Sequence, residues 1–143
     1  MKSPNLTALL LGLLTILISL PTTAEIAVVV SSSSTIGEIT PKIAKSIFLG
    51  KISEMEDGTK VMPIDQEAEE APYAEFYLKI VKKKPEQLAS YWSRRVFTGK
   101  GTPPKMVSDD DDVLELVSRN PNLIGYISIG AVDDTVKVIL QIP

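Results

Sequence analysis

The sequence predicts an α/β domain in which a mixed sheet is flanked by helices. The segment "EIAVVV" (25–30) is a continuous β-branched run, which is typical of a strand buried on both faces. Short apolar segments alternate along the chain with amphipathic helical patterns, and this order is typical of α/β folds. No internal repeat or long linker divides the chain, so we expect one domain over residues 25–143.

Prolines mark the starts of three predicted helices. The first begins at Pro41 with Thr40 as its N-cap, and the next two begin at Pro72 and Pro85. The apolar residues of each helix recur at helical spacing, so we expect them to face the core. They are Ile43, Ala44, Ile47 and Phe48 in the first helix; Tyr73, Phe76, Tyr77, Ile80 and Val81 in the second; and Leu88, Tyr91, Trp92 and Val96 in the third.

Two charged runs are best explained as helix ends. Lys82–Lys84 closes the second helix, where cations meet the negative end of the helix dipole, so a solvated helix end is favoured over a phosphate site. Ser108 with Asp111 forms an N-cap pattern that begins a fourth helix within the run Asp109–Asp112. That run lacks the alternating oxygens and glycine of a calcium-binding EF-hand loop, so we expect no metal site there.

The remaining strands follow from short β-branched segments. We expect them at 61–64, 106–108, 124–129 and 135–142. The dipeptides Asp57-Gly58 and Asp133-Asp134 mark turns between elements.

The first 24 residues have the pattern of a secretory signal peptide. Lys2 precedes the apolar run Leu6–Leu20, and small residues lead to a predicted cleavage after Ala24. The run is short for a membrane-spanning helix, which needs about 20 apolar residues. From the predicted cleavage we expect an exported, periplasmic protein without stable membrane insertion. An uncleaved N-terminal anchor is the alternative.

Composition excludes several classes of function. The chain contains no Cys and no His, which removes most metal sites, the cysteine nucleophiles and the histidine general base. No Gly-x-Ser-x-Gly motif is present, so we expect neither an enzyme nor a cofactor. With 18 acidic and 15 basic residues the net charge is −3, which makes nucleic acid and anionic membranes unexpected partners.

Four segments together resemble the phosphate-binding proteins of bacterial ABC importers, and more closely their short exported relatives. The resemblance extends over residues 26–140. It implies one lobe, the second, of a type 2 periplasmic-binding-protein-like fold, whose full-length members clamp an anion between two α/β lobes. The segments are "AKSIFLGKI" (44–52), "DGTKVMPID" (57–65), "YWSRRVFTGKG" (91–101) and "NPNLIGYI" (120–127).

The sequence departs from this family where the anion would bind. In the family, the turn after the strand that matches 61–64 carries an Arg and a Gly-Ser-Gly-Thr-like run. Backbone N–H groups, hydroxyls and a guanidinium all suit an oxyanion. Here Asp65 or Gln66 stands in place of the Arg, the turn contains Glu67, Glu69 and Glu70, and Pro72 has no N–H. We therefore expect this turn to repel phosphate.

The remaining candidate donors for an oxyanion are the hydroxyls of Ser32, Ser33, Ser34 and Thr35, which follow the first buried strand. A polar connector without a ligand is the alternative explanation of this segment. Two functions stay open. The first is a solute-binding-protein-like domain that binds phosphate or another small oxyanion weakly, alone or as a homodimer. The second is a ligand-free module that binds a periplasmic protein partner.

Overall fold

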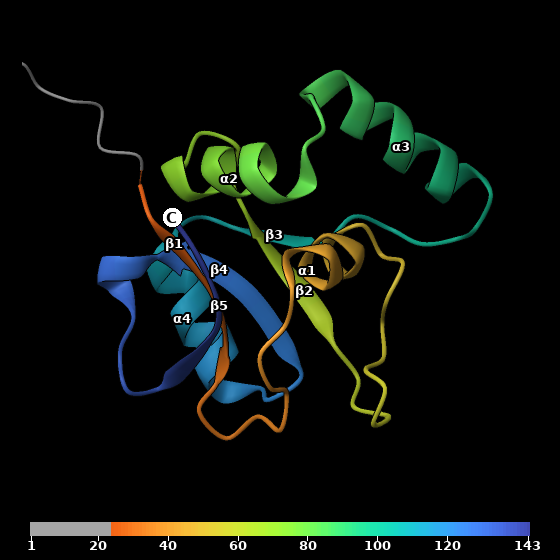
Figure 1. The fold of residues 1–143 in the computed structure, drawn as a ribbon. Helices are drawn as coiled ribbons and strands as arrows, with labels where there is room; N and C mark the ends of the chain where they lie inside the picture. Colours follow the sequence, from red (N-terminus) through yellow and green to blue (C-terminus); the bar gives the residue numbers. More distant parts are fainter. Residues whose placement is uncertain (1–23) are drawn as a thin grey trace, which may run out of the picture.

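The computed structural model describes residues 24–143, which fold around one five-stranded sheet (Figure 1). Residues 1–23, which carry nearly all of the predicted signal peptide, lie outside the described part. In residues 24–143, no helix is both long enough and apolar enough to cross a membrane.

The sheet is mixed, as predicted, and has the strand order β3-β2-β4-β1-β5. Strand β2 runs parallel to both β3 and β4, whereas β1 is antiparallel to β4 and β5. The strands are β1 (Ile26–Ser31), β2 (Met62–Gln66), β3 (Lys105–Val107), β4 (Leu123–Ser128) and β5 (Val136–Ile142).

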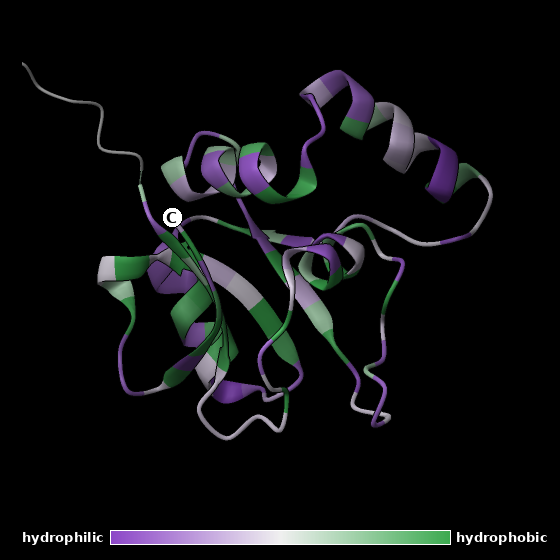
Figure 2. Cartoon of the chain, in the orientation of Figure 1, coloured by the Kyte–Doolittle hydropathy of each residue, from purple (hydrophilic) through white to green (hydrophobic). Residues whose placement is uncertain are grey.

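Strand β1 is buried on both faces, which confirms the prediction from its β-branched run. Ile26, Val28 and Val30 belong to one apolar cluster, and Ala27 and Val29 belong to the cluster on the opposite face. This alternation is what a strand at the centre of a three-layer domain requires. Figure 2 shows hydrophobic residues along most of β1 and β5.

Helices cover the two faces of the sheet. Helix α1 (Pro41–Phe48) and helix α2 (Ala71–Phe76) lie on one face, and α2 continues into a π-helical turn, η1 (Tyr77–Val81). Helix α4 (Asp110–Arg119) packs on the other face through Val113 and Val117. A short 3₁₀ turn, η2 (Ile129–Ala131), follows β4.

The predicted starts of the first two helices agree closely with the structure. Thr40 caps α1, because its hydroxyl accepts a hydrogen bond from the Ile43 N–H at 3.2 Å. Helix α2 begins at Ala71, one residue before the predicted Pro72. The cap of α4 was predicted one residue too early. Asp109, not Ser108, is the N-cap and accepts from the Asp112 N–H at 3.0 Å, and the Asp112 carboxylate accepts from the Ser108 N–H at 3.1 Å.

Helix α3 (Pro85–Phe97) departs from the prediction of a buried stripe. Trp92 is buried and lies against Gly50, but Val96 is about half exposed, and Leu88 and Tyr91 are only partly buried. Figure 1 shows that α3 projects away from the sheet. Leu88 and Tyr91 nevertheless pack against the main apolar cluster, and the Tyr91 hydroxyl donates to the Leu49 carbonyl oxygen at 2.6 Å. Gly99, with a φ of 67°, ends the helix in the left-handed region.

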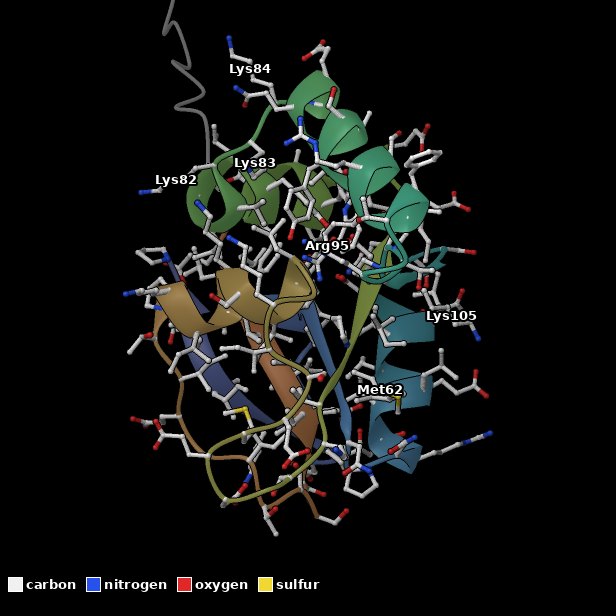
Figure 3. All side chains as sticks on the ribbon, turned by 90° about the vertical axis from the view of Figure 1, so that its right-hand side faces the viewer. Met62, Lys82, Lys83, Lys84, Arg95 and Lys105 are labelled. Carbon is white, nitrogen blue, oxygen red and sulfur yellow. The ribbon has the colours of Figure 1, made fainter. Side chains whose placement is uncertain are left out.

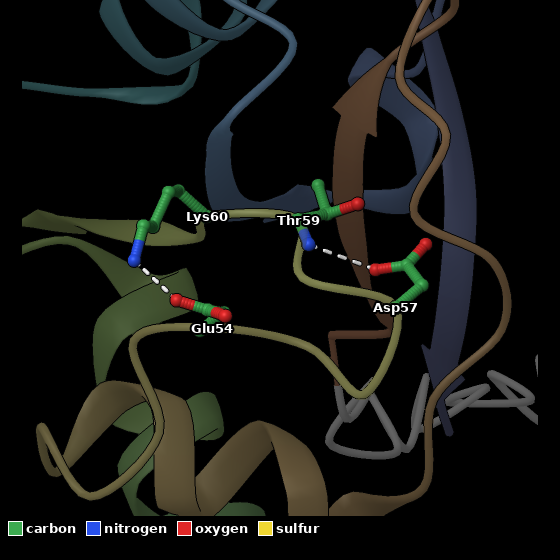
Figure 4. A network of polar contacts seen from close by, with 4 residues as sticks. All are labelled: Glu54, Asp57, Thr59 and Lys60. Atoms are coloured by element: carbon green, nitrogen blue, oxygen red, sulfur yellow. Dashed lines mark hydrogen bonds and ion pairs between the residues drawn. The ribbon is translucent and has the colours of Figure 1, made fainter.

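The hairpin around Asp57-Gly58 confirms the predicted turn (Figure 4). The Asp57 carboxylate accepts a hydrogen bond from the Thr59 N–H at 2.9 Å, and Lys60 pairs with Glu54 across the loop. Hydrogen bonds from Thr59 lower the pKa of Asp57 below its ordinary value. This hairpin brings Thr59 beside Thr35, which matters for the candidate site below.

Gly125 permits close packing between β4 and α4. A Cβ atom at this position would lie 2.6 Å from Val113 Cγ1 and 3.8 Å from the Ile64 carbonyl oxygen. We therefore expect Gly125→Ala to lower the free energy of unfolding by roughly 1–3 kcal/mol, because α4 must move away from the sheet. Urea denaturation measures this loss. Gly130→Ala is the control, because a Cβ there meets nothing within 4 Å; equal losses in the two variants would contradict the proposed packing.

Candidate functional site

Strand β2 is longer than predicted, and this changes the environment of Asp65 and Gln66. The sequence places both residues in a turn after Ile64, but the structure places them inside β2, paired with Met106 and Val107 of β3. Asp65 is only 3% exposed and Gln66 is fully buried. The prediction of an exposed acidic turn beginning at Asp65 is therefore wrong, because pairing with β3 extends the strand to Gln66.

The Asp65 carboxylate is enclosed by hydrogen-bond donors. The hydroxyls of Tyr77 from η1 and Tyr126 from β4 both donate to it, and the Gln66 N–H donates at 3.0 Å. Burial raises the pKa of Asp65 above its ordinary value, although these donors oppose the shift. Burial, together with the charge of Asp65, also raises the pKa of both tyrosines. The two hydroxyls therefore stay protonated and serve as donors.

Gln66 extends this buried network to the start of α4. Its Nε2 atom donates to Asp110 Oδ1 and to the Tyr126 carbonyl oxygen, both at 2.8 Å. The Asp110 carboxylate also accepts from the Ser128 N–H, at 3.2 Å and 3.3 Å. Gln66 Oε1 has no hydrogen-bond partner among the described residues. At this end of the sheet the donors that suit an oxyanion are thus bound to the protein's own carboxylates.

The remaining acidic residues form the turn between β2 and α2. The Glu67 N–H donates to the Val107 carbonyl oxygen at 3.0 Å, and the Glu70 N–H donates to the Glu67 carbonyl oxygen at 3.0 Å. Glu70 is the N-cap of α2, but its side chain accepts no hydrogen bond from the helix. The acidic side chain at the start of α2 therefore does not cap the helix. Glu67, Glu69 and the buried Asp65 make the turn an unfavourable place for an anion.

The predicted hydroxyl donors lie at the other end of the strands from the acidic turn. Val30, at the end of β1, and Pro63, near the start of β2, are both paired with Ile124 of β4. The segment Ser32–Thr35 therefore lies where β2 begins, whereas the acidic turn lies where β2 ends. At about 3.3 Å per residue along β2, the two places are roughly 15 Å apart. The structure therefore keeps the four hydroxyl residues away from the acidic turn, where the sequence resemblance implied an anion site.

Three of the four hydroxyl residues are exposed. Ser32, Ser33 and Thr35 face solvent, whereas Ser34 is 6% exposed and its Oγ accepts from the Ile36 N–H at 3.2 Å. Ser33 Oγ lies 3.0 Å from Ser31 Oγ, and Thr35 Oγ1 lies 3.4 Å from Thr59 Oγ1. These hydroxyls can rotate to donate to a ligand without breaking a bond to the backbone.

A cation lies at this loop. The Lys137 ammonium, from β5, donates to the Ser34 carbonyl oxygen at 2.7 Å. A cleft of about 380 Å³ adjoins the loop and has an apolar floor of isoleucines. Thr35 and four acidic residues also line it, and their negative charges offset that of the lysine: Glu38, Glu54, Glu56 and Asp57. The local field at Ser32–Thr35 is therefore mixed in sign, unlike the uniformly acidic turn after β2.

Lys82–Lys84 lies at the end of η1, as the sequence predicts. Figure 3 shows Lys82 and Lys84 pointing outward at one end of the molecule, whereas the Lys83 ammonium lies 5.6 Å from the centre of the Tyr91 ring. Lys82 has a φ of 55°, which ends the helix. A hollow of about 630 Å³ between η1 and α3 is lined by these lysines and by Tyr73, Tyr77, Leu78, Pro85 and Leu88. Its other walls are mainly apolar and aromatic, and the Tyr77 hydroxyl already donates to Asp65.

The acidic run Asp109–Asp112 is explained by its own hydrogen bonds. Asp109 and Asp112 cap α4, and Asp110 accepts from Gln66 and Ser128. Within residues 24–143, no three Asp or Glu side chains come together as they would around a metal ion.

Comparison with known proteins shows similarity at the level of the fold. No protein-family model and no curated protein sequence matches the chain. Among solved structures, it is similar to an ABC-type phosphate transport receptor from Vibrio cholerae, with 21% identity and a TM-score of 0.64 over 82% of this chain and 47% of that chain. It is also similar to a structure from Clostridium perfringens described as a phosphate ABC transporter substrate-binding protein with bound phosphate, with 23% identity and a TM-score of 0.65 over 82% of this chain and 45% of that chain.

A third similar structure is PstS from Borrelia burgdorferi, with 20% identity and a TM-score of 0.54 over 75% of this chain and 42% of that chain. The chain thus spans less than half of the length of these structures. The mixed sheet and the helices on both of its faces match one α/β lobe. The chain therefore has the fold of a single lobe of the phosphate ABC transporter substrate-binding proteins, as the sequence resemblance predicted.

Proposed function

We propose that this chain is an exported, periplasmic, non-enzymatic domain that binds phosphate or another small oxyanion at Ser32, Ser33, Ser34 and Thr35. The observation that carries the proposal is the similarity of the fold to proteins whose descriptions name phosphate, over 82% of the chain. The cluster of exposed hydroxyls beside the Lys137 ammonium supports it, because hydroxyl donors and a cation suit an oxyanion.

The expected affinity is low. The carboxylates of Glu54 and Asp57 lie on the hairpin that contacts Thr35 through Thr59, and they oppose an incoming anion. A site with a few hydroxyl donors and one cation, open to solvent, is expected to bind in the millimolar range, which corresponds to about 4 kcal/mol. Sulfate should compete with phosphate, because nothing at the loop distinguishes the two tetrahedral anions.

Isothermal titration with phosphate tests the proposal. We expect residues 25–143 to give saturable heat with millimolar phosphate, and the variant with Ser32, Ser33, Ser34 and Thr35 all changed to Ala to give none. Ser34 is buried and accepts a hydrogen bond from the Ile36 N–H, so its loss could unfold the loop and abolish binding indirectly. The triple variant Ser32→Ala, Ser33→Ala, Thr35→Ala keeps Ser34 and should also give no heat.

The matched control changes four exposed hydroxyl residues elsewhere to alanine, namely Ser90, Thr98, Thr102 and Ser108. It should bind phosphate as the unmodified domain does. Binding that survives the loss of all four residues at the loop contradicts the proposed site. An absence of heat from the unmodified domain at 10 mM phosphate contradicts the oxyanion function and favours the protein-binding alternative.

A further inference from the structure

The hollow between η1 and α3 has the size and the walls of a small-molecule site. Its volume of about 630 Å³ falls within the range of about 300–1,000 Å³ that is usual for pockets holding small organic ligands. The rings of Tyr73 and Tyr77 are stacked with their centres 4.3 Å apart and form an aromatic wall. Leu78, on the same wall, is 71% exposed. An apolar ligand in the hollow would remove this surface from water.

The hollow is positively charged, although the protein as a whole is acidic. Lys82, Lys83 and Lys84 all line it, and within residues 24–143 none of them belongs to an ion pair. Of the described residues that line it, none is Asp or Glu. The acidic turn after β2 contributes only Ala68 to the walls. An anion is therefore favoured at the lysine end of the hollow, away from that turn.

The backbone conformation of Lys82 explains why the lysines stand at this place. Its φ of 55° lies in the left-handed region, which side chains other than glycine rarely adopt, and it ends the π-helical turn η1. The chain then passes through Lys83 and Lys84 before α3 begins at Pro85. The three cations thus occupy the junction between the two helices whose separation forms the hollow.

The polar groups of the hollow differ in whether they can reach a ligand. The Tyr77 hydroxyl donates to Asp65, so this residue offers only its ring. Gln87 Oε1 accepts from the Lys84 N–H at 3.0 Å, which leaves the Gln87 amide NH2 group available as a donor. Lysine side chains are flexible, so their ammonium groups can move to an anion. The available polar groups are therefore all donors or cations at one end of an apolar hollow.

We propose that the hollow between η1 and α3 binds an organic anion with an apolar body, such as a medium-chain carboxylate. The anionic group lies among Lys82–Lys84, and the apolar body packs against Tyr73, Tyr77 and Leu78. This ligand differs from phosphate because it requires the apolar walls as well as the cations. The hollow contains none of the residues Ser32–Thr35, so this site and the proposed oxyanion site can fail independently.

Fluorescence titration of residues 25–143 with 8-anilinonaphthalene-1-sulfonate tests the proposal. This probe is an aromatic anion that becomes fluorescent in apolar surroundings. We expect saturable binding with a dissociation constant of roughly 10–100 µM. Octanoate should displace the probe. Octanol has the same chain without the charge, and acetate has the charge without the chain, so each should require at least roughly tenfold higher concentrations.

The contribution of the cations is tested by removing their charge. The triple variant Lys82→Gln, Lys83→Gln, Lys84→Gln should bind the probe roughly tenfold more weakly. The matched control removes the same charge at three exposed lysines that do not line the hollow, and it should bind as the unmodified domain does: Lys42→Gln, Lys51→Gln, Lys100→Gln.

The contribution of the apolar wall is tested at Leu78. Leu78→Gln should weaken probe binding by roughly fivefold, because it replaces an apolar contact with a polar side chain of similar size. Phe97→Gln is the control, since Phe97 is 92% exposed but does not line the hollow. The variant with alanine at Ser32, Ser33, Ser34 and Thr35 should also bind the probe normally.

Three outcomes overturn the proposal. The first is the absence of saturable probe binding up to about 1 mM. The second is binding that either the triple lysine variant or Leu78→Gln leaves unchanged, which would place the probe elsewhere on the protein. The third is a domain that binds vesicles of anionic phospholipid but from which octanoate does not displace the probe, which would identify the lysines as a membrane-contacting surface.

Discussion

Replacing Asp65 with alanine should lower the free energy of unfolding by roughly 2–4 kcal/mol. The substitution leaves the hydroxyls of Tyr77 and Tyr126 without their acceptor in a buried environment. It also removes one of the two acceptors of the Gln66 N–H, which keeps the Tyr126 hydroxyl at 3.3 Å. Each buried donor without a partner costs about 1–3 kcal/mol, and part of this is offset because a buried carboxylate no longer has to be desolvated.

The control for Asp65→Ala is an alanine substitution at an acidic residue of the neighbouring turn. Glu69 is exposed and makes no hydrogen bond through its side chain among the described residues. Glu69→Ala should change the free energy of unfolding by less than about 0.5 kcal/mol. Chemical denaturation at pH 7 measures both variants. If the two losses are equal, Asp65 does not connect β2, η1 and β4 as the structure indicates.

The pH dependence of stability distinguishes the charge of Asp65 from its hydrogen bonds. Burial raises the pKa of Asp65 in the folded state above the ordinary 3.8. The folded protein therefore binds this proton more tightly than the unfolded chain does. The corresponding stability is fully present below pH 3.8 and is lost as the pH rises through the folded pKa.

Asp65→Asn isolates this effect, because asparagine does not titrate. The stability of the unmodified protein minus that of Asp65→Asn should fall as the pH rises from about 3 to 7. Asp57 and Asp133 act in the opposite direction, because hydrogen bonds from Thr59 and Thr135 lower their pKa. Both are present in the two proteins, so their contributions cancel in the difference. A difference that does not vary with pH would contradict the raised pKa.

The sequence predicted those elements whose signals are local. The β-branched run of β1 and the Thr40-Pro41 start of α1 depend on residues next to one another, and both agree with the structure. The carboxyl end of β2 depends instead on β3, a three-residue strand some 40 positions later. Nothing local to Asp65 and Gln66 signals that pairing, so their burial could not be predicted.

The buried polar network was missed for the same reason. Tyr77 has helical spacing and Tyr126 lies in a β-branched strand, so each is adequately explained as a core residue. Their hydroxyls meet at Asp65 only because the sheet order places β2 beside β4 and η1 above both. Likewise, the apolar spacing of α3 predicted a buried stripe, but spacing alone does not state how closely a helix packs on the rest of its domain.

Phe76→Ala should cost about 3–5 kcal/mol of unfolding free energy, the largest loss expected of any substitution considered. Phe76 is fully buried, and its ring lies 4.5 Å from that of Phe48 and 4.3 Å from that of Tyr126. These rings come from α2, α1 and β4, so the deleted side chain leaves a cavity where two helices meet the sheet. The surrounding elements are fixed by strand pairing and can close the cavity only in part.

Phe97→Ala is the matched control, since it removes the same side chain from a position that is 92% exposed. It should change the free energy of unfolding by less than about 0.5 kcal/mol. Urea denaturation measures both variants. A large loss from Phe97→Ala would instead place Phe97 in the core of the lobe and contradict its exposed position at the end of α3.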